Sequence, residues 1–168
     1  MTHPTDTPPA RRLQAAFGLL QPAPGWLSWL IDAHLLLALL AAIPIWIALG
    51  ATDGDRLRVP VGAIAWLALL LWQPLVEELV FRGLMQGKLL ALTGRLRTGP
   101  VSVANLCTTL AFIIWHLTAQ PAAWALVIAA PSLVFGHLRE RFGSVLPAML
   151  VHIVYNAGFG LTAYYVQR

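Results

Sequence analysis

A small number of polar and ionisable side chains interrupt a largely apolar chain. The ones whose chemical types suit a reaction are Glu77, Glu78, Arg82, His116, His152 and Asn156. A glutamate can act as a general base toward water, and a histidine can orient that water or pass a proton to a leaving amine. Histidine and asparagine can also donate hydrogen bonds to a developing oxyanion. These residue types therefore indicate a hydrolytic site.

The same side chains suit a second chemistry. Two imidazoles and a carboxylate can hold a catalytic zinc ion and leave one position open for water. In that interpretation the ligands are Glu77, His116 and His152. The residue types alone do not decide between a metal-free site and a zinc site.

The spacing of these residues assigns them different roles. Glu78 and Arg82 are four residues apart with the carboxylate first, which is the favourable order for an ion pair on a helix. Glu77 is rotated about 100° from Glu78, so it is left free to exchange protons. His152 and Asn156 are also four residues apart and share one helix face. The Glu78–Arg82 pair can equally be structural, because a buried ion pair can fix helix packing without reacting.

The composition places the chain in a membrane. Of the 168 residues 58% are hydrophobic and 11% are charged, with a mean hydropathy of +0.72, whereas soluble domains carry about 25% charged residues. The net charge of +4 comes from basic residues in short gaps between apolar runs, which indicates contact with the membrane surface and no nucleic-acid partner. The single Cys107 excludes an internal disulfide.

We expect an all-α, polytopic helical bundle of about five transmembrane helices, since each span needs roughly 20 apolar residues. The predicted spans are Trp26–Gly50, Val59–Leu92, Val101–Ala119, Ala122–Leu138 and Phe142–Gln167. Pro74 is expected to kink the second span. Residues 1–25 form a Pro-rich polar or interfacial segment, and residues 26–168 form the membrane domain.

The distribution of basic residues predicts the orientation. A cytoplasmic N-terminus places seven basic residues inside, namely Arg11, Arg12, Lys88, Arg95, Arg97, Arg139 and Arg141. Arg56, Arg58 and Arg168 then lie outside, and this asymmetry follows the positive-inside rule. An ionisable residue inside a span costs about 2.5–3.5 kcal/mol, so such residues usually face the protein interior. The candidate site residues should therefore converge.

Three short motifs occur in order along these spans. Glu77–Arg82 matches E-E-x-x-x-R, Phe112–His116 matches F-x-x-x-H, and His152–Asn156 matches H-x-x-x-N. In this order they resemble the CAAX-protease and bacteriocin-processing family of intramembrane endopeptidases, also called the Abi family. The resemblance covers about Val59–Asn156, and the chain looks like a short, prokaryotic-type member with fewer spans than longer relatives.

The resemblance implies roles for the individual residues. Glu77 would activate water with the help of His116, while His152 and Asn156 would line the oxyanion hole. Glu78 and Arg82 would support the site. The family likeness favours no obligatory metal, although zinc remains an alternative. The expected partners are the lipid bilayer and a membrane-anchored protein or peptide, cleaved near a C-terminal sorting or anchor segment in a prokaryotic inner membrane.

Two other functions use the same residues. A non-catalytic immunity or scaffold protein would use the polar cluster only to fix helix packing, but Glu78 and Arg82 already balance each other, which leaves Glu77 surplus. A small proton-coupled transporter would use the cluster as a relay. The low span count and the lack of a detectable internal repeat disfavour a transporter.

Overall fold

A computed structural model of the chain describes residues 9–20, 28–52, 59–94 and 96–168. Trp26, at the predicted start of the first span, lies outside these residues, as do Arg56, Arg58 and Arg95 of the orientation prediction. The described chain is helical apart from one short hairpin, β1 (Arg97–Thr98) paired antiparallel with β2 (Val101–Ser102).

Four helical stretches are long and apolar enough to cross a membrane. They are α2 (Ala33–Thr52), the continuous rod Gly62–Thr93, the pair α7 and α8 over Ala122–Phe142, and α9 (Leu146–Val166). The shorter apolar helix α6 (Val103–Leu117) brings the number to five. The prediction of a polytopic helical bundle with about five apolar helices is thus confirmed.

The long rod is assembled from five segments with different helical geometry. In order they are α3 (Gly62–Leu67), the π-helical η4 (Ala68–Trp72), α4 (Gln73–Glu77), the π-helical η5 (Glu78–Gln86) and α5 (Gly87–Thr93). Pro74, the expected kink, is the second residue of α4 and lies two positions after the end of η4. Proline has no N–H and its ring crowds the carbonyl four residues earlier, so a widened turn accommodates it.

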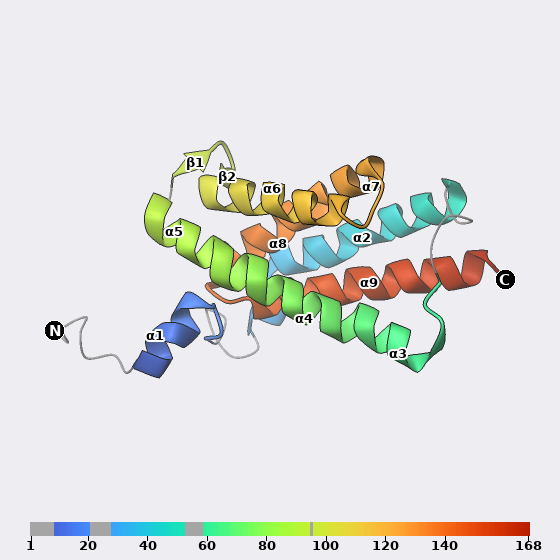
Figure 1. Cartoon of the computed structure of the whole chain (residues 1–168), viewed down its shortest axis with the longest axis horizontal. Coiled ribbons are helices and arrows are strands. Elements are labelled where there is room, and N and C mark those ends of the chain that lie inside the picture. Colours follow the sequence, from blue (N-terminus) through green and yellow to red (C-terminus); the bar gives the residue numbers. More distant parts are fainter. Residues whose placement is uncertain (1–8, 21–27, 53–58, 95) are drawn as a thin grey trace.

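The helix α9 connects the layers of the bundle. It packs against α2, against α8 (Ala129–Phe142) and against η4, while α6 packs on α8 and on η5. In Figure 1 α9 (red) runs from the middle of the molecule to the end marked C, beside the part of the green rod that holds η4 and α4. The buried core lies where α2, α8 and α9 meet and comprises Leu35, Ala38, Phe135, Leu138, Phe142, Ala148 and Val151.

The outward faces of the helices are apolar. On α2 the buried residues are the small Ala38 and Ala42 together with Leu35, whereas large side chains such as Leu37 and Ile47 are about two-thirds exposed. Lipid tails are as apolar as leucine, so small residues at helix contacts and large ones outside are expected in a bilayer. The chain has the surface of an integral membrane protein.

The N-terminal helix α1 (Pro9–Ala16) leads into a turn that contacts η5 at Gly83; α1 is drawn in blue in Figure 1. The Val145 N–H donates to the Gly18 carbonyl at 2.9 Å. A Cβ on Gly83 would lie only 2.8 Å from the Phe17 carbonyl oxygen, so glycine permits this close approach. Two short elements remain. They are η2 (Ser28–Ile31), which precedes α2, and α7 (Ala122–Val127), which follows α6.

Candidate active site

The two adjacent glutamates occupy the junction between α4 and η5. Glu77 ends α4 with its side chain 18% exposed, and Glu78 begins η5 with its side chain fully buried. The two neighbours therefore point into different environments, as their rotation around the helix requires. The predicted difference between a free and an anchored glutamate matches this geometry.

Glu77 and His116 line the same cavity of about 520 Å³. Its wall is built from the rod on one side and from the end of α6 with the following turn on the other. The lining residues are Trp72, Gln73, Val76, Glu77, Val80, Phe81, Trp115, His116, Thr118, Ala119 and Gln120. Trp72 and Trp115 are more than half exposed. A carboxylate and an imidazole from two helices thus face one apolar-walled space.

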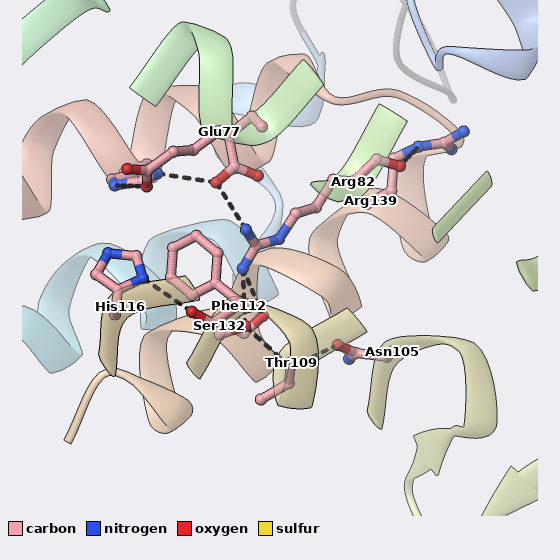
Figure 2. A network of polar contacts seen from close by, with 10 residues as sticks. Glu77, Arg82, Asn105, Thr109, Phe112, His116, Ser132 and Arg139 are labelled. Atoms are coloured by element: carbon pink, nitrogen blue, oxygen red, sulfur yellow. Dashed lines mark hydrogen bonds and ion pairs between the residues drawn. The ribbon is translucent and has the colours of Figure 1, made fainter. Parts of the chain in front are cut away.

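His116 has a defined tautomer. Its Nδ1 lies 2.9 Å from the Phe112 carbonyl oxygen one turn earlier. A carbonyl only accepts, so Nδ1 carries the proton and donates it. In the neutral ring Nε2 then carries the lone pair, which makes it the nitrogen that can accept a proton. Figure 2 shows His116 beside the Phe112 ring, and the two ring centroids are 4.3 Å apart.

His152 contacts both glutamates. Its Nδ1 lies 2.8 Å from the Glu78 Oε1, where the carboxylate accepts, and its Nε2 lies 3.8 Å from the Glu77 Oε2. The ring stacks on Phe135 with centroids 4.7 Å apart. His152 therefore connects the exposed carboxylate to the buried one.

Asn156 lies one turn beyond His152 and is bound to the rod. Its Nδ2 donates to the Leu69 carbonyl oxygen at 2.9 Å. In the π turn the Gln73 N–H bonds to the Ala68 carbonyl, and Pro74 has no N–H to offer Leu69. Asn156 thus supplies a donor that the main chain does not. Neither Asn156 nor His152 is among the residues lining the cavity, but His152 reaches the Glu77 carboxylate at 3.8 Å.

Glu78 and Arg82 form the expected ion pair, with both side chains fully buried and Arg82 Nη1 3.4 Å from the Glu78 Oε1. The guanidinium lies 4.3 Å from the centroid of the Phe112 ring and 5.3 Å from that of Phe135. These aromatic faces attract a cation. The phenylalanine of the F-x-x-x-H motif therefore supports both Arg82 and His116.

Sequence reasoning missed the polar side chains behind Arg82. The Ser132 hydroxyl accepts from Arg82 and donates to Thr109, and Thr109 donates to Asn105. Gln86 donates to Glu140, which also accepts from the Ser102 hydroxyl. The signal was the presence of these hydroxyl and amide residues inside helices that otherwise carry apolar side chains.

The predicted alternative zinc ligands do not gather into a metal centre. Within the described ranges of the chain, no group of three His, Cys, Asp or Glu side chains is arranged to hold a metal ion. Glu77 and His152 approach each other, while His116 stands on the opposite wall of the cavity. The residues as placed do not fit zinc.

The fold and the site together define a class of protein. Several apolar helices carry a partly exposed glutamate, two histidines and a buried Glu–Arg pair, and such ionisable groups within membrane helices mark a functional site. The family model described as type II CAAX prenyl endopeptidase Rce1-like matches residues 59–158, more than half of the chain. The chain belongs to this Rce1-like protease family. No curated protein and no solved structure matches it.

Proposed function

We propose that the chain is an intramembrane endopeptidase that hydrolyses a peptide bond near the C-terminal anchor of a membrane-associated protein. The supporting observation is that Glu77 and His116 line one cavity while the Glu77 carboxylate also approaches His152. Family membership supports protease activity. The site of action we propose is the inner membrane of a prokaryotic cell.

The reaction follows from the side chains. Glu77 takes a proton from a water in the cavity, and the water oxygen attacks the peptide carbonyl carbon. The His116 Nε2 accepts a hydrogen bond from the same water and orients it. The proton then passes from Glu77 to the leaving nitrogen as the C–N bond breaks. This leaves a new carboxylic acid, which ionises by giving its remaining proton to water, and a free amine.

The oxyanion needs hydrogen-bond donors. His152 already donates Nδ1–H to Glu78, so a second N–H at Nε2 belongs to the imidazolium form, and we assign that N–H to the oxyanion. An asparagine amide has two N–H groups. One Asn156 N–H donates to Leu69, and we assign the other to the same oxyanion.

Cleavage assays with matched variants test this proposal. The substrates are a prenylated CAAX peptide and peptides that end in an apolar anchor helix, each in lipid vesicles with purified protein. Glu77→Gln should lower the cleavage rate about 10²–10⁴-fold, whereas Asp32→Asn, a carboxylate-to-amide change at an exposed ion pair outside the cavity, should not. Insensitivity of the wild-type protein to a chelator supports a metal-free glutamate protease, and sensitivity identifies a metal requirement.

The competing function predicts a different result. If wild-type protein and Glu77→Gln are equally inactive on every substrate and equally stable, the polar cluster only fixes helix packing. The immunity or scaffold function would then replace the protease.

A further inference from the structure

The Arg82 guanidinium is held from one side by a single serine. Nη2 donates to the Ser132 hydroxyl at 2.8 Å and to the Ser132 carbonyl at 3.3 Å. Nε and Nη1 make no hydrogen bond to any part of the described chain, although Nη1 is ion-paired to Glu78. Ser132 therefore supplies all of the hydrogen bonds that orient the Arg82 side chain among the described residues.

The hydrogen bonds beyond Ser132 run in one direction. Arginine only donates, so the Ser132 hydroxyl accepts from it and uses its own proton on the Thr109 hydroxyl at 2.9 Å. Thr109 in turn donates to the Asn105 Oδ1 at 3.4 Å, and Asn105 donates to the Leu133 carbonyl at 2.9 Å. Figure 2 shows Arg82, Ser132, Thr109 and Asn105 in this sequence.

This chain of hydrogen bonds is shielded from solvent and lipid. Ser132 is fully buried, and Thr109 and Asn105 are each 3% exposed. Gly136 leaves room for Asn105, because a Cβ there would lie 1.9 Å from the Asn105 Oδ1. With no water to replace a lost partner, each link fixes the next.

From these contacts we infer that Ser132 is a positioning residue for the proposed protease. Ser132 orients Arg82, Arg82 holds the Glu78 Oε1, and that same oxygen accepts from His152 Nδ1. The orientation of the His152 ring, and hence the position of its Nε2 beside Glu77, depends on a hydroxyl of α8 that lies outside the three motifs. The inference rests on the proposed function for its effect on rate, but not for its effect on His152.

The test compares Ser132→Ala with Ser144→Ala in the full chain. Ser144 is a matched control because it is also fully buried but accepts from the Leu146 N–H in the turn before α9. Ring ¹⁵N resonances of His152, assigned with His152→Gln, report its hydrogen bonding by NMR in detergent micelles. Ser132→Ala should shift them, and Ser144→Ala should leave them in place.

The kinetic readout separates positioning from substrate binding. A hydrogen bond to a charged group is lost in Ser132→Ala, so kcat should fall about 10- to 100-fold while KM stays within about twofold. Thr109→Val removes only the next link and should shift His152 in the same direction by less. If Ser132→Ala does not fold, the His152 shift in Thr109→Val tests the inference instead.

His152 resonances that are identical in wild-type protein and Ser132→Ala, or shifted equally by Ser144→Ala, would overturn the inference. Failure of the proposed function gives a different result. In that case the wild-type protein has no protease activity, but Ser132→Ala still shifts the His152 resonances relative to wild type.

Discussion

The cavity side and the buried side of the α4–η5 junction differ although they begin at adjacent glutamates. The cavity side comprises Glu77 and His116 around an apolar-walled space, whereas the buried side comprises Glu78, Arg82 and Ser132 with no exposed side-chain surface. On the buried side the hydrogen bonds and ion pairs are made within the protein. On the cavity side the Glu77 carboxylate lines the space together with His116 and has His152 Nε2 at 3.8 Å. A shift of one residue along the helix therefore places the proposed reacting acid, Glu77, and the supporting acid, Glu78, in different surroundings.

The largest effect is expected on the cavity side. Glu77→Gln keeps the shape of the side chain but removes the base, so the cleavage rate should fall about 10²–10⁴-fold. The free energy of unfolding should change by less than about 1.5 kcal/mol, because glutamine fills the same space in this largely buried position, where 18% of the side chain is exposed. Rates on anchored peptides and thermal unfolding in detergent measure both quantities. A large loss of stability would contradict the separation of the two sides.

On the buried side the effect should fall on stability. Arg82→Met leaves Glu78 as a buried charge without its guanidinium, which should lower the free energy of unfolding by about 3–5 kcal/mol. The double variant Glu78→Gln/Arg82→Met removes both charges and should recover most of that loss. Chemical unfolding in detergent measures the two variants. A double variant no more stable than Arg82→Met would show that the ion pair is not the cause.

Asn156 tests the link between α9 and the rod. Asn156→Ala leaves the Leu69 carbonyl without its side-chain donor and should cost about 1–3 kcal/mol of unfolding free energy. In a Pro74→Ala background the main chain regains an N–H at position 74, so the same substitution should cost less than half as much. Additive losses in this double-mutant cycle would refute the compensation.

The smallest effect is expected at an exposed ion pair that serves as a reference for the buried one. Arg141 binds both carboxylate oxygens of Asp32, and this guanidinium lowers the pKa of Asp32 to about 2. A lowered carboxyl pKa stabilises the folded protein above the unfolded value of 3.8, and that stabilisation is lost as the pH falls toward 2.

Asp32→Asn should therefore cost less than about 1 kcal/mol at pH 7, and this cost should shrink steadily as the pH falls from 3.8 through about 2. Thermal unfolding of both proteins across this pH range measures the difference. A difference of the same size at pH 7 and at pH 2 would show that the pair does not act through the Asp32 charge.

Much of this arrangement could be predicted from the residues. Length and hydropathy were enough for the helices, and the spacing of Glu78 and Arg82 was enough for their ion pair. The contact of Asn156 with Leu69 was not predictable, because it depends on a π turn that sequence periodicity does not encode. Ser132 was missed because a serine in an apolar helix has no spacing signal, and its importance comes from a neighbour 50 positions away.

The contact of Phe17 with Gly83 shows that the segment before α2 belongs to the folded protein and cannot be removed without loss. Residues 59–158 carry the family likeness, yet the Gly18 carbonyl accepts from Val145 and the Ala38 carbonyl accepts from the Tyr155 hydroxyl. A protein shortened to the family boundaries would strip both partners from the helices that hold the site. Affinity tags and fluorescent labels therefore belong ahead of α1, with Phe17 and Gly18 kept intact.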